Sequence, residues 1–382
     1  MGSQFKTAVA SVANVFVPRA TFDVSSSIVR SYFLGHHQGA LNSMRKILSN
    51  IGLVVECRDS RVPLTSTNPL LEQSLAGRDR IIVYTKSSLT FFSNKSRLKQ
   101  KQEHLLQKWH AERSGRTFDA DDVTPSNTHV VFTDESRPKS IQELLDAMKD
   151  RARSADTLTG LRALVVGMPN AGKSSLLNSM RQVGMNKAKA AKTGAQPGVT
   201  RKLSTPVRVI PEDMEGGIDQ GVFVVDTPGV FVPYVGEVDA MLKLSLVGCV
   251  KDSIVPWEIL ADYLLFHMNL RDPDLYGEFC PPTNDAADFL DAVARRTGKL
   301  EKGGAPSREF AAPWIVQQFR KGNLGKFCLD EIDDESLQGW SRKGQAGGDP
   351  NEKISMNQAR KREKEARKVR GLAKKAARDG GA

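Results

Sequence analysis

The sequence predicts an α/β protein: a doubly wound, mostly parallel sheet, followed by a small all-α domain and a basic tail. Over the first 230 or so residues, short apolar strands alternate with segments of helical period, which is typical of a parallel sheet covered on both faces. A glycine-rich loop at residues 167–174 stands between a strand and a helix, as phosphate-binding loops do. Beyond about residue 236 the strand pattern stops, and helical spacing broken by Pro and Gly begins.

The expected elements alternate along the chain. Strands are predicted within residues 49–63, 78–86, 128–136, 161–167, 205–210 and 221–229. Helices between them are predicted within residues 96–112, 140–153 and 173–182. The later helical segments are predicted within residues 241–270, 285–298 and 311–325. No internal repeat is visible in the sequence.

The change of pattern predicts four parts. Residues 29–235 should form the sheet domain, 236–335 the helical domain and 336–382 a basic, disordered or RNA-bound tail. Residues 1–28 hold Lys6 and Arg19, several small and hydroxylated residues, and no acidic residue before Asp23. That composition is typical of a mitochondrial transit peptide and predicts a targeting segment.

Charge is distributed unevenly along the chain. The formal net charge is +11 over 382 residues, and residues 341–382 hold thirteen Lys and Arg against five Asp and Glu. Most of the excess therefore lies in the tail, which predicts a polyanionic partner such as nucleic acid or an anionic lipid surface. A solvated tail that only keeps the protein soluble is the alternative. No stretch reaches the roughly 18 apolar residues of a membrane span, so we expect no transmembrane segment.

The loop GMPNAGKS at residues 167–174 matches the pattern G-x-x-x-x-G-K-[ST]. Glycine lets the backbone wrap phosphates with its N–H groups, Lys173 reaches the β and γ oxygens, and Ser174 offers a hydroxyl to Mg²⁺. The nucleotide-binding residues expected in this loop are Asn170, Ala171, Gly172, Lys173, Ser174 and Ser175.

Two later motifs resemble the switches of GTPases. VVDTPG places Asp226 at the end of a strand, where it suits a water-mediated contact to Mg²⁺, and the N–H of Gly229 can sense a γ-phosphate. QPGVTR supplies Thr200, whose hydroxyl can close over the metal when that phosphate is present. In this order after a phosphate loop, the motifs predict a GTPase.

The base-reading loops are expected upstream of the phosphate loop. No Asn-Lys-x-Asp motif follows it, but Lys86 comes directly after a strand, and a second base loop is expected at Thr133 and Asp134. With the base loops first and the switches last, the order predicts a circularly permuted P-loop GTPase domain. The base-contacting residues expected in the first of these loops are Thr85, Lys86, Ser87 and Ser88.

At this point the chain resembles a known family, the circularly permuted ribosome-assembly GTPases of the YlqF/RbgA type, and most closely their mitochondrial ribosome-associated branch. The resemblance covers roughly residues 30–330 and rests on FLGHHQGA, DSRVPLTSTNP, GMPNAGKSS, PGVT, DTPGV, LVGCVKD and FRKGNLGKF. It implies a factor that binds and hydrolyses GTP during assembly of the mitochondrial large ribosomal subunit, binds its rRNA and leaves after hydrolysis. It also implies the matrix side of the inner membrane as a peripheral location. We expect a monomer.

The chain departs from the family pattern at the base loop. Thr85-Lys86-Ser87-Ser88 stands where the family has Asn-Lys-x-Asp. The Asp carboxylate normally accepts both edge protons of guanine, a bidentate pair that Ser88 cannot reproduce. The sequence therefore leaves the strictness of guanine selection open and predicts reduced affinity.

The catalytic group is also unusual. Val230 follows the DTPG motif where many GTPases hold a glutamine, and an alkyl group cannot orient water. The resemblance implies that His36 takes this catalytic role, although the adjacent His37 leaves the assignment between the two open. Asn170 resembles the asparagine of potassium-activated GTPases and implies a K⁺ ion beside the phosphates. A plain turn residue is the alternative for Asn170.

Residues 181–202 hold six basic residues and no acidic one, and they include the first switch. Ordering this loop on GTP would present positive charge to RNA phosphates; an ordinary solvated loop is the alternative. The main hypothesis for function is the mitochondrial ribosome-assembly GTPase. A non-hydrolysing, nucleotide-binding RNA scaffold on the mitochondrial ribosome is the rival, and a generic cytosolic P-loop ATPase comes third.

Overall fold

The computed structural model describes residues 16–23, 35–75, 77–90, 97–113, 128–155, 159–191, 203–230, 235 and 237–346. The chain divides into two compact units, each made of two stretches of sequence. One unit joins residues 24–256 to 319–382, and the other joins 1–23 to 257–318. We call them the sheet unit and the helical unit.

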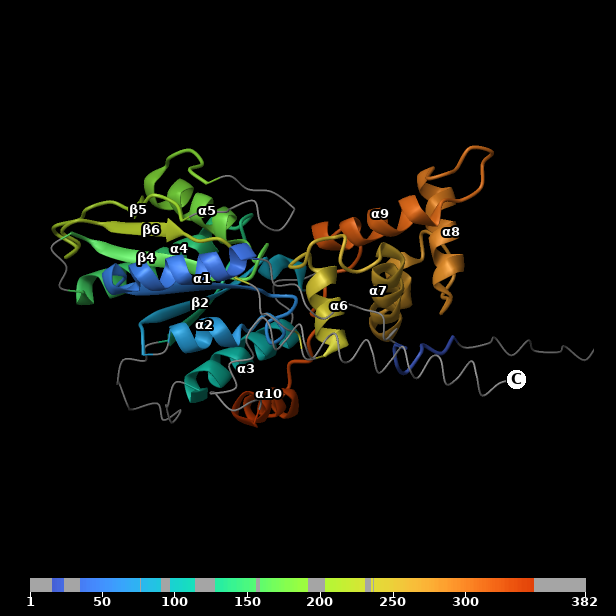
Figure 1. Cartoon of the computed structure of the whole chain (residues 1–382), viewed down its shortest axis with the longest axis horizontal. Coiled ribbons are helices and arrows are strands. Elements are labelled where there is room, and N and C mark those ends of the chain that lie inside the picture. The colour runs from blue at the N-terminus through green and yellow to red at the C-terminus, as the bar shows by residue number, and fades with distance from the viewer. Residues whose placement is uncertain are drawn as a thin grey trace, which may run out of the picture. The chain divides into compact units, whose positions relative to one another are not determined.

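Among the residues described, the sheet unit is built on six strands in the order β3-β2-β1-β4-β6-β5 (Figure 1). Neighbouring strands run parallel except β5, which pairs antiparallel with β6. The strands are β1 (Leu53–Asp59), β2 (Arg80–Thr85), β3 (Thr128–Phe132), β4 (Leu161–Gly167), β5 (Val207–Ile210) and β6 (Val222–Asp226). Each lies within a predicted strand segment, so the mostly parallel sheet is confirmed.

One face of the sheet is covered by α4 (Pro138–Ser154) and α5 (Lys173–Met185). Alternate residues of the central strands point to this face and pack with the apolar side of both helices. The packing is dense at the crossing of α5 with β5, where a Cβ on Gly184 would lie 2.1 Å from the carbonyl oxygen of Val209. This glycine lets α5 lie directly on the sheet, which holds the first turn of the helix at the sheet edge.

The other face is covered by α1 (Gly35–Ile47), α2 (Pro69–Ser74) and α3 (Arg97–Arg113). Here a buried charge network joins the strands to α2: Arg58 Nε lies 2.7 Å from Glu56 Oε1, and its terminal nitrogen lies 2.7 Å from Glu72 Oε1. Arg80 completes the network against both carboxylates. Because each charge is paired, burial of these groups inside the sheet is tolerated.

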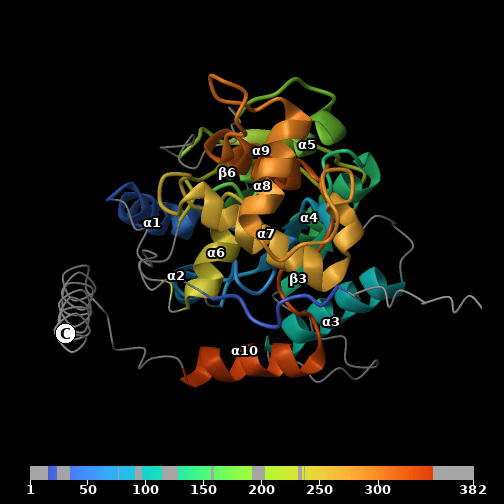
Figure 2. The same cartoon turned by 90° about the vertical axis from the view of Figure 1, so that its right-hand side faces the viewer.

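The C-terminal part of the sheet unit wraps onto the same face. Asp330 accepts hydrogen bonds from the main-chain nitrogens of Leu64 and Thr65, both 2.9 Å, and from the hydroxyl of Thr65. Helix α10 (Asp334–Ala346) then lies beside α3, where Trp109 Nε1 donates to Ser341 Oγ at 2.9 Å (Figure 2). The described segment 319–346 therefore belongs to the sheet unit, as does α6 (Val238–Leu246).

The helical unit holds α7 (Trp257–Arg271), the 3₁₀ turn η3 (Pro273–Tyr276), α8 (Ala286–Thr297) and the first part of α9 (Arg308–Lys321). Residues 16–23 pack in the same unit. Arg19 pairs with Asp262 at 2.5 Å, and the ring of Phe22 contacts Tyr263 edge-on. Asn284 Nδ2 donates to the carbonyl oxygen of Val17 at 2.8 Å. Part of the predicted targeting segment is thus integral to the helical unit.

The α/β class and the all-α region after it are confirmed, whereas the boundaries at 235/236 and 335/336 stay predictions. The compact units of the structure divide at 256/257 and 318/319 instead. The basic tail at 347–382 lies outside the described residues. Within the described part of the chain, no helix is long and apolar enough to cross a membrane.

Candidate nucleotide site

The sequence motifs meet at one edge of the sheet, because parallel strands bring their carboxyl ends together. β1 ends at Asp59, β2 at Thr85, β4 at Gly167 and β6 at Asp226. The phosphate loop follows β4, the first base loop follows β2, and the second switch follows β6. Open parallel sheets bind ligands at this carboxyl edge, so the fold itself places the predicted residues together.

The backbone conformation of the phosphate loop requires glycine. Gly167 has a φ of 142°, and a Cβ there would lie 2.3 Å from the carbonyl oxygen of Cys57 on the neighbouring strand. Gly172 and Asn170 are left-handed, with φ of 85° and 55°. Asparagine is among the few non-glycine residues that accept this region, so the turn alternative weighed for Asn170 describes its backbone correctly.

Lys173 opens α5 and is buried, with Nζ donating to the carbonyl oxygens of Met168 at 2.8 Å and Gly167 at 3.3 Å. Burial lowers the pKa of this amine, while the nearby Asp226 carboxylate opposes the shift. The ammonium is therefore folded back over its own loop. Phosphate oxygens can replace these carbonyl contacts with charge-assisted ones.

Ser174 and Asp226 fit a Mg²⁺ ion. The Ser174 hydroxyl donates to Asp226 Oδ2 at 2.5 Å, and Asp226 Oδ1 is buried with no hydrogen-bond partner in the structure. Burial also raises the pKa of Asp226 above that of an ordinary aspartate, although Lys173 counteracts it. An orphaned carboxylate oxygen beside a hydroxyl is the oxygen chemistry that Mg²⁺ prefers, so these two residues suit the metal directly or through water.

The second switch is packed against the phosphate loop. A Cβ on Gly229 would lie 2.6 Å from Pro169, so only glycine allows this approach. The main-chain N–H of Val230 donates to the carbonyl oxygen of Gly167 at 3.1 Å, and Asn68 Nδ2 donates to that of Val230 at 2.9 Å. The predicted Gly229 is thus placed beside the phosphate loop, and the Val230 side chain is buried.

The first base loop is bonded to the phosphate loop through two side chains. Thr85 Oγ1 donates to the carbonyl oxygen of Ala171 at 2.8 Å, and Lys86 Nζ donates to that of Asn170 at 2.8 Å. Lys86 has a left-handed φ of 56° and also pairs with Asp59 at 2.8 Å. The structure therefore brings together the upstream loop and the phosphate loop, as the permuted order predicts.

The second base loop is joined to the first. The main-chain nitrogen of Ser87 donates to the carbonyl oxygen of Thr133 at 3.1 Å, and that of Ser88 donates to Asp134 Oδ2 at 3.1 Å. Asp134 Oδ1 accepts from the nitrogen of Ser136 at 2.8 Å and from the Ser136 hydroxyl. All six predicted base-loop residues consequently lie in one connected group.

Asp59 and Gly248 were not predicted as site residues, but the structure places both in contact with residues that were, Lys86 and Asn170. Asp59 is fully buried, and Arg61 and Lys86 overcome the effect of burial and hold the pKa of its carboxyl well below the usual range. The carbonyl oxygen of Gly248 accepts from Asn170 Nδ2 at 2.8 Å. Both residues lie in motifs that carry the family resemblance, DSRVP and LVGCVKD, but the sequence of these motifs does not predict which residues they contact.

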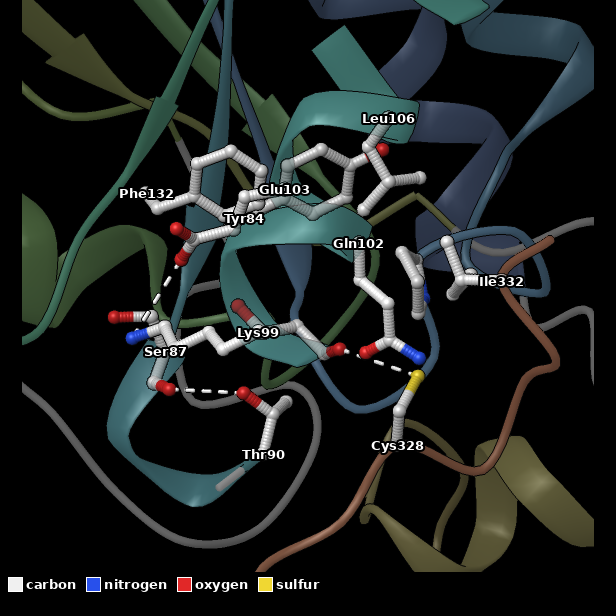
Figure 3. A pocket seen from close by; sticks show the side chains of 12 residues that line it. Tyr84, Ser87, Thr90, Lys99, Gln102, Glu103, Leu106, Phe132, Cys328 and Ile332 are labelled. Carbon is white, nitrogen blue, oxygen red and sulfur yellow. Dashed lines mark hydrogen bonds and ion pairs between the residues drawn. The ribbon is translucent and has the colours of Figure 1, made fainter. Parts of the chain in front are cut away.

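A small pocket lies between the first base loop and α3 (Figure 3). Ser87 and Thr90 line one side, with the Thr90 hydroxyl donating to the carbonyl oxygen of Ser87 at 2.9 Å, and Lys99 pairs with Glu103 on α3. Cys328 closes another side. No phosphate-loop residue lines this pocket, so it is separate from the predicted phosphate site.

Other predicted site residues are placed only in part. His36 and His37 lie in the first turn of α1, but the structure describes their backbone alone. Thr200 lies outside the described residues. Ser175 lies in the first turn of α5, next to Ser174. The roles given to these residues stay predictions.

Comparisons with known proteins identify a family and several relatives. A family model described as "50S ribosome-binding GTPase" matches residues 162–269. "Mitochondrial GTPase 1" of Schizosaccharomyces pombe is 38% identical over 84% of this chain and 95% of its own length. "Mitochondrial ribosome-associated GTPase 1" of Xenopus tropicalis is 31% identical over 82% of this chain and 98% of its own. The crystal structure of YlqF from T. maritima with GNP bound covers 78% of this chain and 99% of that one, at 21% identity and a TM-score of 0.48.

Proposed function

Because the chain belongs to the family of mitochondrial GTPase 1 and mitochondrial ribosome-associated GTPase 1, we propose that it is a mitochondrial GTPase that assists assembly of the large ribosomal subunit. It binds GTP with Mg²⁺ at the carboxyl edge of the sheet. It contacts rRNA while GTP is bound and leaves the subunit after hydrolysis. It acts as a monomer in the matrix, with peripheral contact to the inner membrane.

The observation that carries the enzyme over the scaffold is the pair Ser174 and Asp226. A nucleotide-binding scaffold needs the phosphate loop, but it does not need a buried carboxylate with an orphaned oxygen beside the metal-binding hydroxyl. Ser174 and Asp226 would hold Mg²⁺, which would neutralise charge that develops on the phosphates during transfer. Around it, Lys173 would bind the phosphate oxygens, and the N–H of Gly229 would sense the γ-phosphate.

Orientation of the attacking water falls to a group other than residue 230. Val230 is buried and its N–H is bonded to Gly167, so position 230 offers no side chain to water. We assign this role to His36, at the start of α1. K⁺ beside Asn170 would add positive charge near the phosphates. The hydrogen bond from Asn170 Nδ2 to the carbonyl oxygen of Gly248 fixes the orientation of the amide group.

RNA contacts are assigned to the basic loop and the tail. In the described part of the loop, Lys187 and Lys189 are exposed and follow directly on α5, the helix that the phosphate loop opens. Their position suits phosphate contacts that depend on the state of the loop beyond them, which includes Thr200. The tail at 347–382 would add contacts that do not depend on sequence.

Contacts within the helical unit limit where a targeting segment could be cleaved. Arg19 and Phe22 contact α7, and Val17 contacts Asn284, so removal of residues 16–23 would remove these contacts from the folded unit. We therefore place cleavage of a leader before Phe16. Mass spectrometry of the mature protein from mitochondria tests this position; a mature N-terminus beyond Asp23 would contradict it.

The experiment that tests the function is GTP turnover by the purified protein, in potassium and in sodium buffer, with large subunits, small subunits or neither. We expect turnover to rise with large subunits and with potassium, and to fall in His36→Ala but not in His37→Ala. ATP in excess should not compete. Large-subunit binding without turnover would identify the scaffold instead, and turnover of ATP would identify the ATPase.

A further inference from the structure

Recognition of guanine has a chemical requirement that the first base loop does not meet. The edge of guanine presents two neighbouring donors, N1–H and the 2-amino group, which a single ionised carboxylate accepts together. Position 88 is a serine, whose hydroxyl offers one weak acceptor. A carboxylate is therefore needed from another part of the site.

Two acidic residues lie in the second base loop among residues that the structure describes at 133–137, Asp134 and Glu135. Glu135 is exposed, whereas Asp134 is only 6% exposed. The Asp134 carboxylate is directed across to the first base loop, where Oδ2 lies 3.1 Å from the main-chain nitrogen of Ser88. The carboxylate that position 88 lacks is thus present on the adjacent loop, in contact with position 88.

We propose that Asp134 reads the N1–H and 2-amino edge of guanine and is the residue that makes this site select guanine. The inference rests on the nucleotide site proposed above. It assigns a specificity role to a side chain of the second base loop, whereas Ser88 contributes a small side chain that leaves space for it.

The charge state and the bonding capacity of Asp134 suit this role. Burial acts to raise the pKa of its carboxyl, but hydrogen bonds from Ser136 and Ser88 outweigh that effect and leave the pKa below the ordinary value, so the group is ionised at neutral pH. A carboxylate accepts about four hydrogen bonds, and Asp134 accepts three from Ser88 and Ser136. Guanine needs two acceptor positions, and one remains. The second becomes available when the hydroxyl of Ser136, an exposed residue, turns to water.

The serine at position 88 follows from the same arrangement. An aspartate there would bring a second carboxylate beside Asp134, and two carboxylates sharing one site hold a proton between them. Such a site would lose part of the charge that guanine needs. The pair Ser88 and Asp134 keeps one ionised carboxylate at the base edge, which a pair of aspartates would not.

Asp134 also has a purely local role available, since Oδ1 closes the turn before α4 by accepting from Ser136. The two roles are separated by xanthosine triphosphate, in which O2 replaces the 2-amino group. An asparagine accepts N1–H and donates to O2, so Asp134→Asn should favour the xanthine nucleotide. A residue that only closes a turn would not change the choice between two bases.

The test measures dissociation constants of GTP, XTP and ATP by displacement of a fluorescent GDP, for the full chain with Mg²⁺. Asp134→Asn should weaken GTP about 10- to 100-fold and lower the GTP-to-XTP affinity ratio by at least about 100-fold. Asp146→Asn, on the exposed face of α4, is the matched control and should change neither value. The double variant Ser88→Asp with Asp134→Asn should return the GTP-to-XTP affinity ratio toward that of the wild type. Because the double variant contains Asp134→Asn, this recovery would show that the substitution is compatible with a folded protein.

Equal weakening of GTP, XTP and ATP in Asp134→Asn would overturn the inference and leave Asp134 as a turn residue. An unchanged GTP affinity would overturn it as well. Wild-type protein that binds no guanine nucleotide would overturn both this inference and the nucleotide site beneath it, so the two failures are distinguishable.

Discussion

The phosphate-binding half of the site and its base-binding half follow the GTPase pattern to different degrees. Residues 167–174 and 226–229 keep every motif position, whereas residues 85–88 keep only Lys86 of the Asn-Lys-x-Asp motif. Phosphates are bound mainly by backbone N–H groups, whose direction depends on unusual φ values at Gly167 and Gly172. A base edge is read by side chains, and an adjacent loop can supply these. We therefore expect substitutions in the phosphate-binding half to cost more GTP affinity than substitutions in the base-binding half, where an adjacent loop can supply the side chain that reads the base.

The comparison predicts its largest effect at Lys173. Replacement by alanine removes the charge that we propose contacts the β and γ oxygens, worth about 3 kcal/mol for a charge-assisted contact, so GTP affinity should fall at least about 100-fold. Isothermal titration checks the value, with Lys139→Ala on exposed α4 as the matched control. A loss below about tenfold would show that the phosphate half is as tolerant as the base half.

Asp226 should give the next largest effect, and it should appear in the metal. Asp226→Asn removes the charge of the oxygen that has no partner, so the Mg²⁺ concentration for half-maximal GTP binding should rise about tenfold or more. Binding of GTP without metal should change little. If the Mg²⁺ requirement stays as in the wild type, the orphaned oxygen does not serve the metal.

Thr85 tests the base half with a smaller change. Thr85→Val keeps the shape but removes the hydrogen bond to Ala171, worth about 1 kcal/mol, so GTP affinity should fall about fivefold. The control is Thr297→Val, which loses a bond of the same kind to Val293 in the helical unit. An equal effect of both variants on GTP affinity would mean that Thr85 acts only through general stability.

Much of the fold could be predicted from the sequence, and the reason is local. Buried parallel strands contain continuous apolar runs, such as residues 163–167 of β4, and the phosphate loop needs glycine where φ is positive. The permuted order also follows from motif positions alone. The contacts of Asp134 with Ser88, and of Asn170 with Gly248, could not be predicted, because they join loops whose approach depends on strand order.

The same limit applies to the unit boundary. Helical spacing after residue 236 predicts helices correctly, but it does not say which helices pack on the sheet. α6 and residues 319–346 belong to the sheet unit, which they join through contacts such as Asp330 with Thr65, 265 positions apart in the sequence. The composition of residues 16–23 is that of a leader peptide and gives no indication that they contact α7.

The smallest predicted effect is a pH dependence of stability without nucleotide. Burial raises the pKa of Asp226 in the folded state, so the folded state binds that proton more tightly than the unfolded state does. The free energy of unfolding should therefore fall as the pH rises from the ordinary aspartate range through the raised value. Urea unfolding at several pH values measures this fall, and Asp226→Asn should reduce it. A fall of the same size in the variant would assign it to other groups.

The most direct test of the central claim is the wild-type preference among nucleotides, measured as the dissociation constants of GTP, ATP and XTP under one condition. If the rebuilt base half selects guanine, GTP should bind at least about 100-fold more tightly than either competitor, because a site built to pair with a polar edge rejects bases that cannot pair. Equal binding of all three would contradict the account, since it would leave a working phosphate half beside a base half that reads nothing.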